Sequence, residues 1–110
     1  MFLIFFFCVH AASAAETDER TVAIPVAFSF SAPRALSAAL AGSFNHWDPS
    51  RHHLQGPDRN GTWTITIQLP PGRYEYLFVI DNNRWELDPA AATTDDGMGG
   101  RNSVVVVGPK

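Results

Sequence analysis

The chain has 110 residues, with Lys+Arg 8 and Asp+Glu 11, so its formal net charge is −3 and its length suits one domain. This acidic balance argues against binding to a nucleic-acid backbone. The single cysteine excludes an internal disulfide and a cysteine-based zinc finger.

The first segment of the chain, residues 1–15, is uncharged and rich in phenylalanine. It is shorter than the roughly 20 apolar residues that a membrane-spanning helix needs. Its small residues Ala12-Ser13-Ala14 form an Ala-x-Ala pattern, so we expect a signal peptide over residues 1–14, although no Lys or Arg precedes it. Cleavage would remove Cys8 and leave a periplasmic or secreted domain at 20–108 with no membrane attachment. The alternatives are an uncleaved anchor or an N-terminal strand.

The next segments predict two strands. Residues 22–30 alternate apolar and small or polar side chains, which indicates a half-buried strand. Pro25 cannot donate a ladder hydrogen bond, so this strand is expected at a sheet edge. Residues 36–44 predict a second strand with Leu36, Ala38 and Leu40 in phase, although their alanine content also permits a helix.

The middle of the chain predicts a loop followed by a hairpin. Residues 45–60 are polar and turn-rich, with Leu54 as an apolar anchor. Residues 63–69 and 73–81 both alternate, and the Pro-Pro-Gly sequence between them is typical of a tight turn. We therefore expect these strands to pair as a hairpin, with Trp63 in the core and Leu77 facing outward.

The last segments complete an all-β pattern. Residues 90–100 are expected to form a loop, and residues 103–107 form a β-branched strand. Six or so short strands separated by turns predict a β-sandwich of the immunoglobulin type.

Catalytic and metal chemistry find little support in the sequence. No nucleophile elbow, His-Glu-x-x-His motif or phosphate-binding glycine loop is present. Asp81 and Asp88 are a conceivable carboxylate pair, but both lie in turn-forming strings that explain them without catalysis. We therefore expect no catalytic residues, no enzyme activity and no cofactor.

Four potential metal ligands cluster in the predicted loop: His46, Asp48, His52 and His53. Their spacing is irregular and follows no strand or helix, whereas zinc or nickel sites need ligands that converge. We expect no metal site here.

Two tryptophans fall outside the alternating strands. Trp47 lies in a loop and Trp85 follows a turn, so the pattern leaves both burial and surface function open. A flat apolar ring packs well against the C–H face of a sugar, and neighbouring polar side chains can then bond its hydroxyls.

Several motifs, in order along the chain, together resemble carbohydrate-binding module family 48. They are Leu-Ala-Gly-Ser-Phe-Asn-His-Trp at 40–47, Gly-Thr-Trp at 61–63, the segment at 69–81, Trp-Glu-Leu-Asp-Pro at 85–89, and Asn-Ser-Val-Val-Val-Val at 102–107. This family includes the glycogen-binding domain of the AMP-activated protein kinase β subunit and the N-terminal modules of isoamylases and branching enzymes. The resemblance extends from about residue 21 to residue 107.

The resemblance implies an early-set β-sandwich that binds α-1,4-glucan such as glycogen, starch or maltodextrin. Trp47 and Trp85 match the two ring-stacking tryptophans of the family. Asn102 matches its hydroxyl-binding asparagine, and Met98 matches the bulky residue that inserts beside the glucan. Leu77 occupies the position of a sugar-contacting lysine, so one polar contact differs.

We therefore expect non-catalytic binding of α-glucan, in company with a separate amylase-like enzyme. The alternative is a protein–protein interaction module of the same fold that has lost sugar binding and scaffolds an envelope enzyme or assembly. The leucine at position 77 favours that alternative, whereas the four matching residues together favour sugar.

Overall fold

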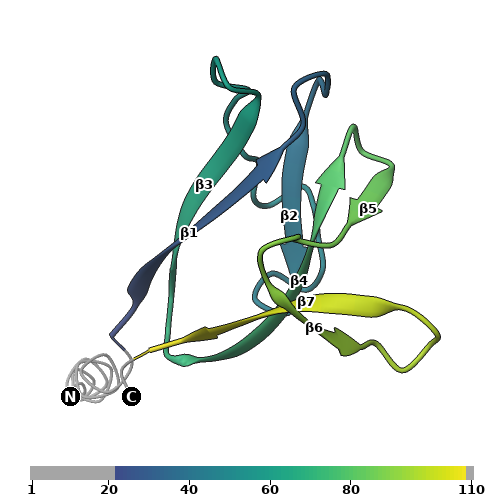
Figure 1. Cartoon of the computed structure of the whole chain (residues 1–110). Coiled ribbons are helices and arrows are strands. Elements are labelled where there is room, and N and C mark those ends of the chain that lie inside the picture. The colour runs from purple at the N-terminus through teal and green to yellow at the C-terminus, as the bar shows by residue number, and fades with distance from the viewer. Residues whose placement is uncertain (1–21, 109–110) are drawn as a thin grey trace, which may run out of the picture.

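The computed structural model describes residues 22–108, which form two antiparallel sheets (Figure 1). The predicted leader lies outside the described residues. The strands are β1 (Ile24–Ser31), β2 (Ala38–Gly42), β3 (Thr62–Leu69), β4 (Gly72–Ile80), β5 (Arg84–Glu86), β6 (Ala92–Asp95) and β7 (Arg101–Val107). The smaller sheet is β1-β3; the larger has the order β2-β4-β7-β6, with β5 paired to β4. This arrangement confirms the predicted all-β class, and residues 22–108 contain no helix suited to spanning a membrane.

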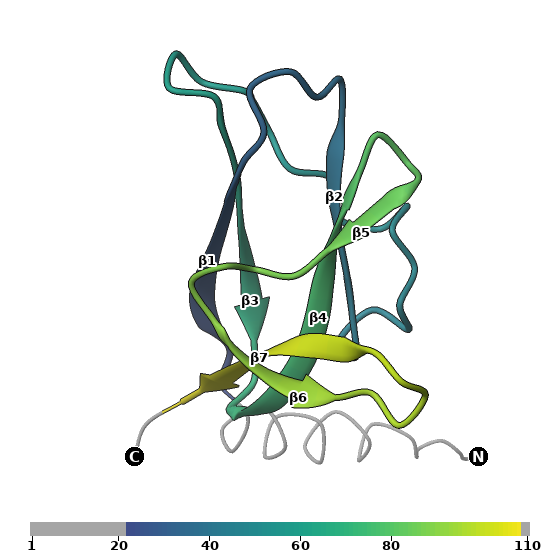
Figure 2. The same cartoon turned by 45° about the vertical axis from the view of Figure 1, so that its right-hand side comes forward.

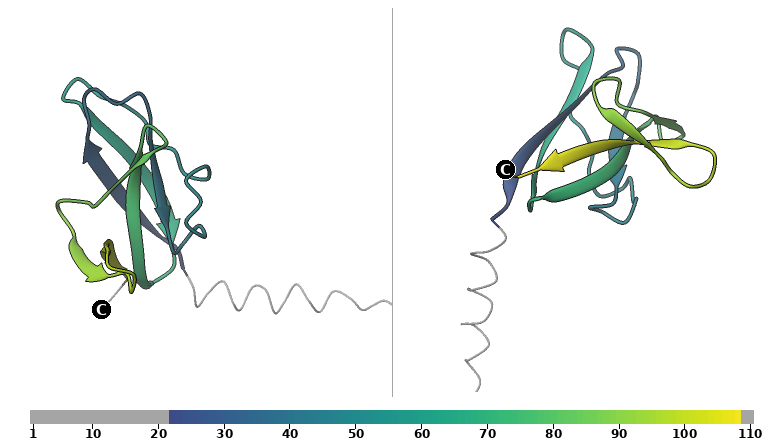
Figure 3. Two further views of the ribbon diagram at one scale, coloured as in Figure 1. Left: turned by 90° about the vertical axis from the view of Figure 1, so that its right-hand side faces the viewer. Right: turned by 60° about the horizontal axis from the view of Figure 1, so that its bottom comes forward.

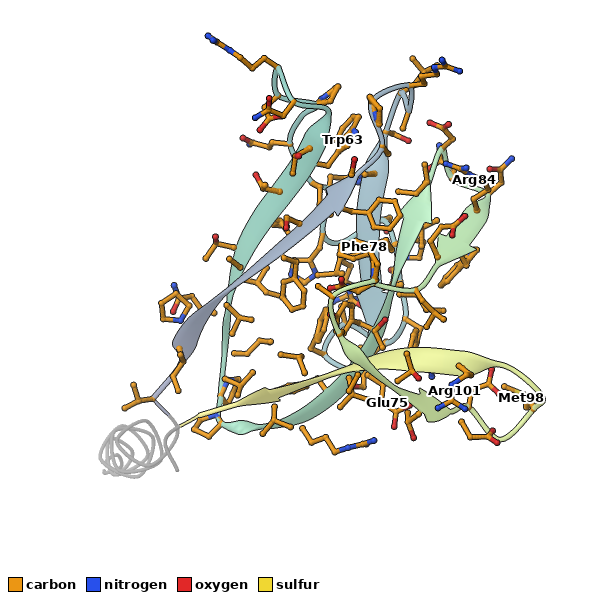
Figure 4. The ribbon with its side chains drawn as sticks, in the orientation of Figure 1. Trp63, Glu75, Phe78, Arg84, Met98 and Arg101 are labelled. Atoms are coloured by element: carbon orange, nitrogen blue, oxygen red, sulfur yellow. The ribbon has the colours of Figure 1, made fainter. Side chains whose placement is uncertain are left out.

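The two sheets face each other across an apolar core (Figure 2). From the smaller sheet, Phe28 and Trp63 are buried in it, and from the larger sheet Leu40, Phe78 and Ile80. Figure 4 shows the Trp63 and Phe78 side chains inside the sandwich. The indole N–H of Trp63 donates to the carbonyl oxygen of residue 32 at 2.9 Å, so its one polar atom is satisfied. The core position predicted for Trp63 is confirmed, and Leu54, expected as an apolar anchor of the loop, is buried.

The hairpin predicted between residues 63–69 and 73–81 is wrong. Strand β3 pairs with β1, whereas β4 lies in the other sheet, between β2 and β7. Pro70 and Pro71 supply no N–H groups for a ladder at this corner. The apolar faces of both strands must also meet the same core from opposite sides, so the chain crosses between sheets here, as Figure 3 shows in two further views.

The strand predicted over residues 36–44 is shorter, and its first residue is not in the core. Leu36 is 91% exposed and precedes β2. The carboxylate of Asp81 accepts the Leu36 N–H at 2.7 Å and the Ser37 N–H at 3.2 Å. These bonds hold residues 36–37 in a turn beside the β4–β5 connection, and the ladder starts only at Ala38.

Residues 90–100, predicted as loop, contain strand β6. It pairs with β7 in a register that places Ala92 opposite Val104 and Thr94 opposite Asn102. The strand contains no large apolar side chain, so neither hydrophobic alternation nor composition marks it. Pairing with the edge of β7 creates it, and the loop at 96–100 becomes the tip of a hairpin (Figure 1).

Candidate functional site

The outer face of the larger sheet is built around alternate residues of β4. Tyr76 and Phe78 point into the core, so Glu75, Leu77 and Val79 project to the other side. Residues directly opposite across a ladder project to the same side. Ala41 lies opposite Leu77, and Ala39 and Trp85 flank Val79.

Small side chains lie at the centre of this face, beneath an aromatic ring. Ala39, Ala41 and Val79 form a small buried cluster on it, and the Trp47 ring packs against that cluster. Every residue of β2 is therefore buried, because both sides of the strand are covered.

A tight turn after β2 presents Trp47 to the sheet. His46 and Trp47 both have a φ of 59°, a left-handed conformation that non-glycine residues adopt only when their surroundings hold them there. The Trp47 N–H donates to the Gly42 carbonyl at 2.9 Å. A Cβ on Gly42 would lie 2.6 Å from the Glu75 carbonyl oxygen, so glycine allows the turn to approach β4.

Asn45 holds this turn from inside and is 2% exposed. Its Oδ1 accepts the Gly42 N–H at 3.0 Å, and its Nδ2 donates to the Leu40 carbonyl at 2.9 Å. Nδ2 also lies 2.9 Å from His52 Nδ1; because an amide NH2 only donates, the ring nitrogen accepts. No sequence pattern marks Asn45 as a positioning residue. In the sequence it looks like any other loop asparagine, and only its burial in the structure distinguishes it.

Trp85 reaches the same face from β5. The residues 80–83 form a tight turn in which Asp81 and Asn82 have positive φ and the Asn83 N–H donates to the Ile80 carbonyl at 3.1 Å. This geometry is that of a type I′ turn, which sends β5 back along β4. Trp85 is 48% exposed.

The tip of the β6–β7 hairpin carries Met98, which is 86% exposed. Asp96 organises this tip: its Oδ1 accepts the N–H groups of Met98 at 2.8 Å and of Gly100 at 2.9 Å. These bonds lower the pKa of the Asp96 carboxyl below its usual value. The apolar side chain is thus offered to solvent on an ordered loop (Figure 4).

A groove of about 410 Å³ lies where these elements meet. It is lined by Trp47, Glu75, Leu77, Asp96, Met98 and Asn102. The structure thus brings four of the five sequence-predicted residues together. Trp85 does not line the groove and lies farther along the same face, opposite Val79. Glu75 and Asp96 join the set, although no sequence motif marks either as a site residue.

Glu75 forms the polar centre of the groove. Its Oε1 accepts from Asn102 Nδ2 at 3.1 Å and its Oε2 from an Arg73 guanidinium nitrogen at 2.9 Å. The bonds from Asn102 and then Arg73 lower the pKa of the Glu75 carboxyl. Since a carboxylate only accepts, the Asn102 amide must turn its NH2 toward Glu75 and its carbonyl oxygen away.

The other candidate chemical groups have structural partners. Asp81 caps the backbone before β2, and Asp88 accepts the Tyr76 hydroxyl at 2.6 Å and the Ala90 N–H at 2.9 Å. Within residues 22–108, no three His, Cys, Asp or Glu side chains gather into a set able to hold a metal.

Comparison with known families identifies the fold. A family model described as the glycogen recognition site of AMP-activated protein kinase matches residues 24–110. The chain belongs to this family. The domain is of the carbohydrate-binding module 48 type, which glucan branching enzymes and PTST proteins share. The predicted family and β-sandwich are confirmed.

Three relatives show the range of proteins that carry similar domains. The chloroplastic protein PTST homolog 2 of Arabidopsis thaliana is 30% identical over 73 residues, which are 66% of this chain and 13% of the relative. Protein PTST of the same plant is 33% identical, and the match covers 66% of this chain and 26% of the relative. The 1,4-alpha-glucan branching enzyme GlgB of Vibrio cholerae is 43% identical, and the match covers 50% of this chain and 7% of the relative. The chain thus spans about a quarter or less of each relative.

Proposed function

We propose that this glycogen recognition domain binds α-1,4-glucan without catalysis, through the outer face of its larger sheet. The observation that carries the proposal is the groove in which the apolar Trp47, Leu77 and Met98 meet the polar Asn102 and Glu75. Sugars have apolar C–H faces and polar hydroxyl rims, and a surface that offers both kinds of contact side by side suits them.

Each residue of this face takes one part in the proposed site. Trp47 and Trp85 stack on sugar rings at two places along β4, and Met98 inserts beside the curved chain. The carbonyl oxygen of Asn102 accepts a hydrogen bond from a sugar hydroxyl. Leu77 provides an apolar surface at the base of the groove. An open surface with two stacking rings should bind in roughly the micromolar to millimolar range.

Tryptophan fluorescence titrated with maltoheptaose and β-cyclodextrin tests the proposal. The wild-type domain should show a saturable change, and Trp85→Ala should weaken binding about two- to tenfold, since a lost stacking contact costs about 0.5–1.5 kcal/mol. Leu36→Ala is the matched control, because Leu36 is a highly exposed apolar residue outside the proposed site. It should bind like the wild type.

An interaction module of the same fold is the second candidate, favoured by Leu77 and by the 86% exposure of Met98. Leucine and methionine contribute to apolar protein contacts as readily as to sugar contacts. A folded domain that shows no response up to about millimolar sugar, the weak end of the expected range, would refute glucan binding and favour this candidate.

We further propose that the domain acts in the periplasm or outside the cell, beside a separate amylase-like enzyme. The uncharged leader with its Ala-x-Ala pattern supports export, and the names of the branching-enzyme relatives support an α-glucan setting. N-terminal sequencing of the expressed protein should find a start at or near Ala15. A start at Met1 would refute cleavage.

A further inference from the structure

The charged side chains that line the groove have one sign. Of the residues that line it, Glu75 and Asp96 are the two charged ones, and both are acidic. Their pKa values are lowered by hydrogen bonds, so both carboxylates are ionised at neutral pH. A ligand in the groove therefore lies beside two negative charges.

One cation partly offsets this charge. Arg73 contacts Glu75 Oε2 at 2.9 Å, but the guanidinium does not line the groove. It approaches one carboxylate oxygen, while the other oxygen faces Asn102. Asp96 makes no ion pair within the described residues; backbone N–H groups bind it instead. The three groups together leave an excess of one negative charge at the ligand's position.

We propose that Glu75 and Asp96 are specificity-determining residues that make the groove select neutral glucan chains against glucans carrying phosphate, carboxylate or other anionic substituents. The inference rests on the proposed glucan site and adds a rule for which glucans enter it. Carboxylates accept hydrogen bonds from sugar hydroxyls, whereas an anionic substituent has no cation to meet in the groove. Leu77, at the floor, adds no charge that could compensate.

Two substituted β-cyclodextrins of similar bulk provide the test: hydroxypropyl-β-cyclodextrin, which is neutral, and carboxymethyl-β-cyclodextrin, which is anionic. At about 20 mM salt, where screening is weak, the anionic ligand should bind about three- to tenfold more weakly. Raising the salt to about 500 mM should bring the two affinities together, because the Debye length falls to a few ångströms.

Glu75→Gln isolates the charge from the hydrogen bond. The glutamine side-chain oxygen can still accept from Asn102, while one negative charge disappears and Arg73 loses its partner. The affinity ratio of the two ligands should fall toward one. Glu86→Gln is the matched control: it removes the same charge on β5 at a position opposite Phe78, on the other side of the sheet. That variant should keep the wild-type ratio.

Each outcome decides a different claim. Equal binding of both cyclodextrins at low salt, or a ratio unchanged by Glu75→Gln in a folded variant, would overturn the selectivity and leave glucan binding intact. Failure of the neutral ligand and of unmodified β-cyclodextrin to bind at all would overturn the proposed function, and the selectivity with it.

Discussion

Replacing Asn45 with alanine should loosen the turn that carries Trp47. The buried amide of Asn45 joins Gly42, Leu40 and His52 through three hydrogen bonds of 2.9–3.0 Å. Alanine would leave the Gly42 N–H and the His52 ring without these partners. The two positive-φ residues that follow depend on this frame to hold their strained backbone.

The size of the effect follows from those three contacts. A buried intramolecular hydrogen bond contributes about 1 kcal/mol net, and a buried group left without a partner costs about 1–3 kcal/mol. We expect Asn45→Ala to lower the free energy of unfolding by about 2–4 kcal/mol, out of about 5–10 kcal/mol for a domain of this size. The unfolding midpoint should fall by about 10–20 °C.

Urea and thermal unfolding measure the loss, and the same preparation can be titrated with maltoheptaose. Binding at a temperature where the variant is folded should weaken about three- to tenfold, because the Trp47 turn must be ordered on binding. Asn60→Ala, at an exposed loop asparagine, should change stability by no more than about 0.5 kcal/mol. If Asn45→Ala unfolds like that control, the amide does not hold the turn and the reasoning fails.

Two further predictions concern the Tyr76 hydroxyl and the dependence of stability on acidic pH. Tyr76→Phe removes the hydrogen bond to Asp88 and should lower the free energy of unfolding by about 1.5–3 kcal/mol, the contribution of a hydrogen bond to a charged group. Tyr74→Phe is the control, because the Tyr74 hydroxyl contacts a backbone carbonyl at the surface. It should lower the free energy of unfolding by less than about 1 kcal/mol in the same urea series. Asp48 and Asp96 have lowered pKa values in the folded state, so the stability they contribute is present above about pH 4 and is lost as the pH falls through their folded values. Replacing both by asparagine should lower the thermal midpoint at pH 7 and flatten its decline below pH 4. An unchanged acid decline would contradict this assignment.

Large side chains in alternation made much of the fold predictable. The apolar face of β1 and the core role of Trp63 follow directly from a period of two, and Pro25 correctly indicated an edge strand with one partner among the described strands. Sheet membership was not predictable in the same way. The turn before β4 resembles a hairpin turn in composition, and only the need to cover the core from both sides sends β4 to the second sheet.

The site was predictable in its apolar parts more than in its polar ones. The alternation of side chains along the strand was enough to place Leu77 on the outer face. The family resemblance supplied Trp47, Met98 and Asn102, and the structure brings all four residues to one groove. The residues that organise the groove gave no such signal. Asn45 acts through burial that a loop sequence does not reveal, and Asp96 acts by binding the backbone of its own turn.

The small residues of β2 explain how so small a domain can both fold and present a binding surface. Leu40 faces the main core, while Ala39 and Ala41 face outward and are buried beneath Trp47. A larger residue at either alanine would push the ring off the sheet. With alanine there, Trp47 packs against the sheet and is held before any ligand arrives, which reduces the ordering cost of binding. Trp47, the residue proposed to bind sugar, therefore also covers a second, small apolar cluster on the outer side of the sheet.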